Sequence, residues 1–141
     1  MTDMFAVERR LSELDHVRLS RLVHRHKGGR RTSPTTGPIE QLLGAAEVLS
    51  WPELPPDVVT MRSRVLLQDL QTGLTSRWTL SFPGDAESGA NRVSVLSPLG
   101  FSLLGQRAGA TVRWSTPAGD TLAAVVLDIL FQPESSGDYA M

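Results

Sequence analysis

The sequence predicts an α+β protein, in which a short antiparallel helical hairpin precedes a largely antiparallel sheet of about five strands. Three observations predict this class. Apolar residues recur at helical spacing before residue 50, three prolines interrupt the chain at 51–57, and apolar and polar residues alternate after residue 57. We therefore expect residues 1–52 to form the hairpin and residues 53–141 to form a globular domain.

The first helix is expected at residues 14–26. Asp15 stands near its start, where a carboxylate can accept hydrogen bonds from the free N–H groups of the first turn. One face is apolar, and the arginines share the solvent side at spacings of three and four residues. The apolar residues are Leu19, Leu22 and Val23, and the arginines are Arg18, Arg21 and Arg25.

The second helix is expected to begin at Pro38, after a loop. The segment KGGRRTSPTTGP, residues 27–38, is rich in Gly, Pro, Ser and Thr, which favours a loop. Gly37 is expected to be the N-cap, since proline fits the first helical position that follows. The apolar residues recur at i, i+3, i+4, i+7 and i+10, and they are Ile39, Leu42, Leu43, Ala46 and Leu49. Two short helices joined by a short loop favour an antiparallel hairpin.

The globular part is expected to be a sheet with one short helix. Alternating segments predict five strands, centred on Val65–Leu67, Trp78–Phe82, Val93–Val95, Val112–Trp114 and Val125–Phe131. Between the third and fourth of these lies SPLGFSLLGQRAG, residues 97–109.

This glycine-rich stretch is expected to be a short helix over residues 98–104 that covers one face of the sheet. Ser97 can cap the helix and Pro98 suits its first position. Gly105 suits a left-handed C-terminal cap, and Gly109 suits the turn into the next strand. Neither a Gly-Lys-Ser/Thr motif nor Gly-x-Gly-x-x-Gly is present, so the stretch is not expected to cradle phosphates.

Charge is distributed unevenly along the chain. Residues 1–31 contain eight Lys or Arg and four Asp or Glu, whereas residues 32–141 contain six Arg and eleven acids. A basic end on an acidic body indicates two surfaces with different partners, although a solvated basic helix without a partner gives the same pattern.

The sequence lacks the residue sets that common catalytic and metal sites require. There is no cysteine, which excludes disulfides and thiolate ligands, and there is no Gly-x-Ser-x-Gly elbow. The histidines His16, His24 and His26 are expected to be exposed on the basic helix. The acid pairs Glu53/Asp57 and Glu134/Asp138 are expected on the surface. We therefore expect no enzyme, no metal and no cofactor.

The chain is expected to be cytoplasmic. No apolar run approaches the ~20 residues that span a bilayer, and the N-terminal residues do not have the pattern of a signal peptide. We expect a monomer with no membrane contact.

Three segments carry a resemblance to a known family. These are DVVTMRSRV, VSVLSPLGFSLLG and the C-terminal FQPESSGDY. Together with the order of elements, they resemble the superfamily that contains the bacterial Gre transcript-cleavage factors and the regulator of nucleoside diphosphate kinase (Rnk). The resemblance implies an FKBP-like body, which is a curved antiparallel sheet holding one short helix. It also implies RNA polymerase as the partner, with the globular domain on the rim of the secondary channel and the hairpin pointing inward.

The resemblance nominates four contact residues. In Gre factors the docking surface lies around the loop and strand that lead into the short helix, and the matching positions here are Asp85, Ser94, Ser97 and Pro98. For Ser97 and Pro98, helix capping alone is the alternative role.

The hairpin tip departs from the family pattern. Gre factors carry acidic residues at the tip of a long coiled coil, where they help to hold a catalytic Mg²⁺ ion. Here the tip is short and has no acid, and its basic residues are Arg25, Lys27, Arg30 and Arg31. The hypothesis is a non-catalytic regulator that occupies the channel entrance and competes with Gre factors without stimulating cleavage. The tip could meet acidic polymerase residues, or weakly contact nucleic acid or a nucleotide, or be a solvated loop.

Two alternative functions remain from the sequence. FKBP-like folds include prolyl isomerases, which need an aromatic-lined pocket. The aromatics here, Trp78, Phe82, Trp114 and Phe131, are expected in the core instead. The other alternative is a regulator of nucleoside diphosphate kinase or nucleotide pools that acts through another partner. The segment Gly137-Asp138-Tyr139 matches the family without an evident physical role.

Overall fold

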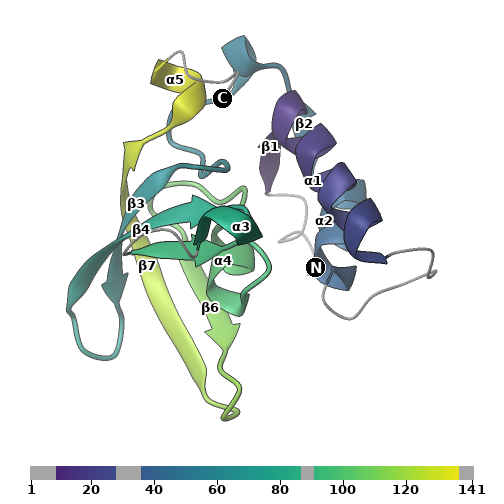
Figure 1. The fold of residues 1–141 in the computed structure, drawn as a ribbon. Coiled ribbons are helices and arrows are strands. Elements are labelled where there is room, and N and C mark those ends of the chain that lie inside the picture. Colours follow the sequence, from purple (N-terminus) through teal and green to yellow (C-terminus); the bar gives the residue numbers. More distant parts are fainter. Residues whose placement is uncertain (1–8, 28–35, 87–90, 137–141) are drawn as a thin grey trace.

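The computed structural model describes residues 9–27, 36–86 and 91–136 of the chain. In the N-terminal part, a helical hairpin is flanked by a two-stranded parallel sheet, and a 3-10 turn follows (Figure 1). The elements are β1 (Arg10–Ser12), α1 (Glu13–Lys27), α2 (Gly37–Ala45), β2 (Glu47–Leu49) and η2 (Trp51–Glu53).

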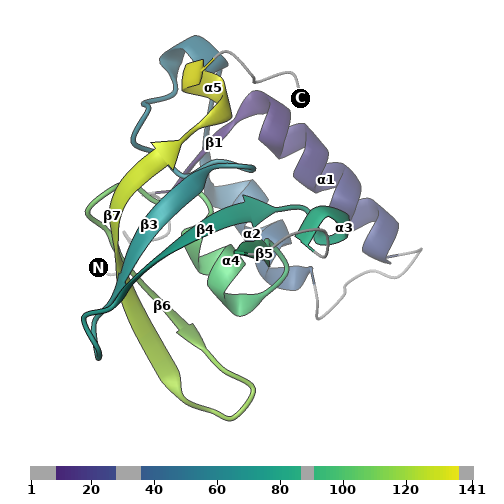
Figure 2. The same cartoon turned by 60° about the vertical axis from the view of Figure 1, so that its left-hand side comes forward.

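The remaining residues form a curved sheet in the order β5-β4-β3-β7-β6, in which β4 and β5 are parallel and the other neighbours are antiparallel. Figure 2 shows how the sheet curls around the short helix α4. This confirms the α+β class, the short helix and the curved, largely antiparallel sheet. The elements are β3 (Arg64–Asp69), β4 (Thr75–Ser81), α3 (Pro83–Ala86), β5 (Arg92–Ser94), α4 (Pro98–Leu103), β6 (Thr111–Ser115), β7 (Thr121–Phe131) and α5 (Pro133–Ser136).

Helix α1 matches the predicted helix closely, but its capping residue is different. The hydroxyl of Ser12 accepts a hydrogen bond from the N–H of Asp15 at 3.0 Å, so Ser12 supplies the cap. The prediction that Asp15 caps the helix is therefore wrong. The side chain of Asp15 is fully buried and points toward the globular part instead.

The second helix is shorter than predicted. Thr36 rather than Gly37 occupies the N-cap position, and the helix ends at Ala45 because Ala46 is extended. Leu49 is therefore not helical. It lies in β2, which pairs in parallel with β1. The helical spacing gave a wrong prediction because residues 47–49 pair as a strand with β1, which lies 37 residues earlier in the chain. The Arg10–Glu47 ion pair, at 3.0 Å, also joins the two strands.

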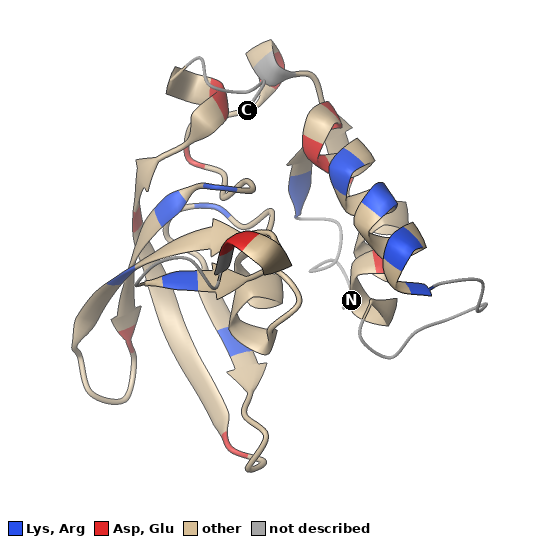
Figure 3. Cartoon of the chain, viewed as in Figure 1, with Lys and Arg blue, Asp and Glu red and all other residues tan. Residues whose placement is uncertain are grey.

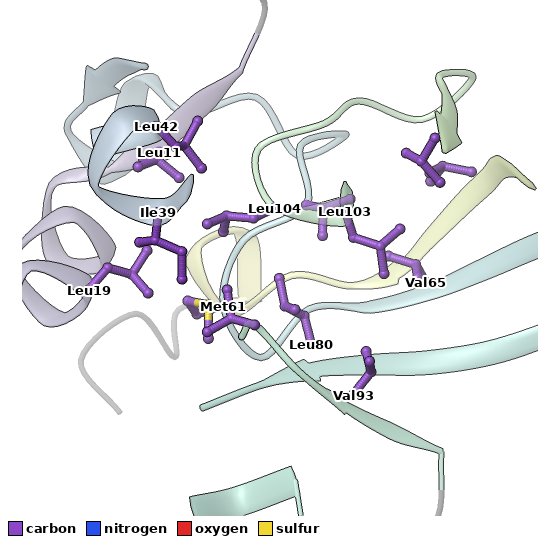
Figure 4. Packing of buried hydrophobic residues seen from close by; sticks show 14 of the residues in the cluster. Leu11, Leu19, Ile39, Leu42, Met61, Val65, Leu80, Val93, Leu103 and Leu104 are labelled. Carbon is purple, nitrogen blue, oxygen red and sulfur yellow. The ribbon is translucent and has the colours of Figure 1, made fainter. Parts of the chain in front are cut away.

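The hairpin and the sheet bury one continuous set of apolar side chains. Leu19 and Ile39 of the hairpin pack toward Met61 and Leu104 of the globular part (Figure 4). The aromatic residues are less deeply buried than predicted. Trp78, Phe82 and Trp114 pack on this core while partly buried, and Phe131 is half-buried.

Three glycines shape the stretch around α4. Gly105 and Gly109 have φ values of +79° and +93°, which confirms the predicted left-handed C-cap and turn. Gly100 has a different role, because a Cβ atom there would overlap the backbone carbonyl of Ser94. The missing side chain lets α4 lie directly on the turn that follows β5.

The Gly100→Ala variant should therefore lose about 2 kcal/mol or more of unfolding free energy, because the added methyl group forces α4 away from backbone atoms that cannot yield. Denaturant unfolding measures this loss. The matched control is Gly44→Ala in α2, where no atom lies within 4 Å of the new methyl group. That variant should be stabilised by about 0.5–1 kcal/mol through helix propensity. Equal effects at the two sites would contradict the packing role of Gly100.

Candidate functional site

The turn between β5 and α4 is held by two serine hydroxyls. The Ser97 hydroxyl donates to the carbonyl of Ser94 at 2.7 Å and accepts from the N–H of Gly100 at 3.1 Å. The Ser94 hydroxyl accepts from the N–H of Leu96 at 3.0 Å. The predicted capping role of Ser97 is thus confirmed, and both hydroxyls have structural partners.

A groove opens beside this turn, where the hairpin meets the globular part. It has a volume of about 420 Å³, and its walls come from α2 on one side and from the turn and α4 on the other. Its lining residues are Pro38, Ile39, Val95, Leu96, Ser97, Pro98 and Phe101. The structure therefore places Ser97 and the exposed Pro98 at one apolar groove.

Asp85 lies apart from this groove. It belongs to α3, which packs against β5, and its carboxylate lies 3.5 Å from Nη2 of Arg62. Its backbone carbonyl accepts a hydrogen bond from Nη1 of Arg92 at 3.4 Å. Of the four predicted contact residues, Ser97 and Pro98 line the groove, Ser94 supports the turn, and Asp85 belongs to a neighbouring charged cluster.

A basic cleft of about 240 Å³ separates α1 from the globular part. Phe82 lies at its floor, and the guanidinium carbons of Arg18 and Arg62 lie 5.5 Å and 5.2 Å from the centre of its ring. Arg21 and Arg25 of α1 complete the lining. Basic residues recur along this helix in Figure 3. The cleft therefore has four arginines in its lining, of which Arg18 and Arg62 lie within cation–π distance of the Phe82 ring.

The predicted hairpin tip is only partly within the described residues. Arg25 is exposed, as predicted for the basic face, while Lys27 forms an ion pair with Glu40 at 3.2 Å. Arg30 and Arg31 lie outside the described residues, as does the segment Gly137-Asp138-Tyr139. Arg18 differs from the prediction, since its side chain is mostly buried and is paired with Asp15.

Asp15 joins the hairpin to the globular part through both of its oxygens. Oδ2 accepts a hydrogen bond from the backbone N–H of Met61 at 2.8 Å, and Oδ1 accepts from Nη2 of Arg18 at 3.0 Å. The pKa of the Asp15 carboxyl is raised to about 6. Burial is the main cause and the charge of Glu134 adds to it, whereas the hydrogen bond from Met61 and the Arg18 contact oppose the shift.

A second buried acid, Glu134, holds the same loop from the other side. The hydroxyl of Thr60 donates to Oε1 of Glu134 at 2.7 Å, and the hydroxyl of Ser63 lies 2.8 Å from that of Thr60. Gln132 adds two hydrogen bonds, from Nε2 to the carbonyls of Pro55 and Val58 at 2.9 Å and 2.8 Å. The prediction that Glu134 lies on the surface is therefore wrong, because this loop supplies a buried hydroxyl partner.

The remaining acids and the histidines are mostly exposed. His24 and His26 are exposed, as predicted, whereas His16 is partly buried and its Nε2 lies 3.0 Å from the carbonyl oxygen of Leu43. Glu53 and Asp57 are exposed, as predicted, and Asp138 lies outside the described residues. Among the described residues, no group of three or more His, Cys, Asp or Glu side chains could hold a metal ion. No helix in the described part of the chain has the length and apolar content needed to cross a membrane.

Comparison with known proteins identifies the family. Residues 54–131 match the sequence model described as "Transcription elongation factor, GreA/GreB, C-term". The chain is also 36% identical over 108 residues to the regulator of nucleoside diphosphate kinase of Escherichia coli, which covers 77% of this chain and 79% of that protein. The chain belongs to the Gre/Rnk family.

Two further relatives support this assignment. The transcription elongation factor GreA of Thermotoga petrophila is 37% identical over 81 residues, which is 57% of this chain and 51% of that factor. The structure of the GreA/GreB elongation factor from Nitrosomonas europaea superposes with a TM-score of 0.71 at 30% identity, and the match covers 88% of this chain and 98% of that one. Because this structural match covers 88% of the chain, it includes much of the hairpin as well as the sheet.

The buried carboxyl of Asp15 makes stability depend on pH. Its pKa is raised in the folded protein, so the folded state keeps a proton that the unfolded chain releases between about pH 4 and 6. The stabilisation that protonation gives is present below this range and is lost as the pH rises through about 6. Relative to the Asp15→Asn variant, the protein should therefore gain on the order of 2 kcal/mol as the pH falls from 7 to 4.

Denaturant unfolding of both proteins between pH 4 and 8 measures this difference. The comparison with Asn cancels the contributions of titrating groups that do not interact with Asp15. A difference that stays constant over the whole range would show that the Asp15 carboxyl does not titrate in this way.

Proposed function

We propose that this chain is a non-catalytic transcription regulator that binds bacterial RNA polymerase at the secondary channel, where it competes with Gre factors without stimulating transcript cleavage. The observation that carries the proposal is the GreA/GreB match over residues 54–131, joined to an N-terminal helical hairpin. Residues 53–141 would dock on the channel rim, and the hairpin within residues 1–52 would point into the channel.

The hairpin supports the non-catalytic part of the proposal. Helix α1 has 15 residues, so at 1.5 Å per residue it is about 22 Å long. Residues 27–38 contain no acidic side chain. Mg²⁺ requires hard oxygen ligands such as carboxylates, and a tip with Lys and Arg alone repels the ion. A short basic hairpin can therefore occupy a channel without delivering a metal ion.

The groove beside α4 supports the docking part of the proposal. Its walls are apolar, through Ile39, Val95 and Phe101, and the exposed Pro98 stands at its rim. An apolar side chain of the polymerase can fill such a groove, which is how anchor residues bind in protein interfaces. Ser94 and Ser97 hold the turn that shapes the groove, whereas Asp85, the fourth nominated contact residue, lies outside the groove on α3.

The basic side chains of the hairpin would then meet anionic groups inside the channel. Arg25 is exposed at the end of α1, and Lys27, Arg30 and Arg31 follow it. Arginine side chains bind both the carboxylates of acidic polymerase residues and the phosphates of nucleic acid.

Replacing Arg25, Arg30 and Arg31 by Gln should weaken binding to the polymerase without affecting the contact at the channel rim.

The first experiment is binding of the purified full chain to bacterial core RNA polymerase, in competition with a Gre factor, followed by a cleavage assay on stalled elongation complexes. We expect binding that the Gre factor displaces, with no added cleavage, because the tip has no carboxylate for Mg²⁺. Failure of the polymerase to retain the protein would refute the docking proposal. Stimulated cleavage would refute the non-catalytic part.

The Pro98→Glu variant tests the groove directly. Glutamate at the first helical position is compatible with α4, since the helix N-terminus favours negative charge. The variant should therefore fold normally and bind the polymerase about tenfold more weakly, because a charge now stands at the apolar rim. The matched control is Pro117→Glu in the exposed β6–β7 turn, which should bind like the unmodified protein. Equal affinity of the two variants would exclude the groove as the contact.

A further inference from the structure

The outer face of the sheet carries a second basic site, away from the hairpin. A hollow of about 320 Å³ is lined by three arginines and two neutral polar residues. The arginines come from three adjacent strands, with Arg64 on β3, Arg77 on β4 and Arg92 at the start of β5. Thr79 and Asn91 complete the lining.

Strand register brings these side chains together. Thr79 is paired with Arg64 on one side and with Arg92 on the other. Neighbouring strands lie about 4.8 Å apart, so the two arginines flank the threonine at about 10 Å from each other. Arg77 is two residues from Thr79 and therefore points to the same face. The three guanidinium groups can converge above the Thr79 hydroxyl.

Among residues 9–27, 36–86 and 91–136, no carboxylate lines the hollow. Within the part of the chain that the structure describes, Arg64 and Arg77 form no ion pair. Arg92 is oriented by the hydrogen bond from its Nη1 to the carbonyl of Asp85. Asp128, on β7, lies opposite Leu66 and outside the lining. The site therefore concentrates positive charge on a rigid sheet.

This arrangement does not serve the fold. No two of these arginines are directly paired across strands, but their like charges share one face and repel one another. The three side chains are exposed rather than packed in the core. An anion in the hollow would remove that repulsion. Guanidinium groups match phosphate oxygens with paired hydrogen bonds, and the Thr79 hydroxyl and Asn91 amide add neutral donors.

We propose that this hollow binds the terminal phosphate or diphosphate group of a small molecule. Three arginines in the lining of one hollow fit a compact, highly charged group. The described residues of the lining include no aromatic side chain, so they offer no platform for stacked bases of a nucleic acid strand. The site is separate from the groove at Pro98 and does not depend on the proposed binding to polymerase.

Calorimetric titration of the full chain with inorganic diphosphate tests the proposal. We expect saturable binding that is weaker with inorganic phosphate, which has fewer oxygens for the three arginines. Arg77→Gln should lower the affinity about tenfold or more, because hydrogen bonds to charged groups are among the stronger ones. The matched control is Arg113→Gln on β6, which is exposed and outside the lining, and it should bind normally.

Thermal unfolding gives a second readout. Diphosphate should raise the melting temperature of the unmodified protein but not that of Arg77→Gln, since a ligand stabilises the state that binds it. Without ligand, Arg77→Gln should be at least as stable as the unmodified protein, because a repulsive charge has been removed. If Arg77→Gln does not fold, the same titration and unfolding measurements are made on Arg64→Gln.

Three results would overturn the proposal. The first is equal affinity for diphosphate in the unmodified protein and in the Arg77→Gln and Arg64→Gln variants. The second is no binding of diphosphate at millimolar concentration. The third is binding of a single-stranded oligonucleotide in place of diphosphate. The last result would assign the site to a nucleic acid backbone. Because Pro98→Glu should bind diphosphate normally, failure here is distinguishable from failure of the polymerase proposal.

Discussion

The buried carboxylate of Asp15 holds helix α1 against the loop that precedes the sheet. A carboxylate removed from water is costly unless it has hydrogen-bond partners, and the Met61 N–H and the Arg18 guanidinium supply them. Arg18 in turn lies over Phe82, next to Arg62. Asp15 therefore also positions Arg18, one of the residues that line the basic cleft.

The same loop is held from its other side by the C-terminal segment. Glu134 accepts the hydrogen bond from Thr60, and Gln132 donates to the carbonyls of Pro55 and Val58. Hairpin, loop and C-terminal segment thus form one polar network beneath a shared apolar core. These contacts hold the hairpin and the C-terminal segment on one loop. The proposed docking, with the sheet domain on the channel rim and the hairpin inside, would depend on this arrangement.

The two proposed binding surfaces depend on different parts of this structure. The groove at Pro98 exists only where α2 meets α4, so it requires the hairpin to be seated on the sheet domain. The arginines of the hollow come from β3, β4 and β5, and their placement follows from strand register. One surface is apolar and the other is cationic, which suits partners of different chemistry.

Local features were predictable from the sequence because near neighbours determine them. The extent of α1, the Ser97 cap, the left-handed Gly105 and the alternation along the strands all arise from interactions within a few residues. The resemblance to Gre factors also allowed Asp85, Ser94, Ser97 and Pro98 to be nominated as contact residues, and this nomination stays a prediction.

Tertiary structure alone decided the features that join distant segments. Leu49 follows a helical pattern, yet it pairs with β1 because that edge becomes available only in the folded chain. Asp15 resembles a capping residue and Glu134 a surface acid, but each finds its partner 46 or 74 residues away. Arg64, Arg77 and Arg92 are unremarkable in the sequence and converge only through strand register. A sequence pattern predicts interactions between residues that are close in the chain. Burial and charge clustering depend instead on contacts between distant residues, which form only when the chain folds.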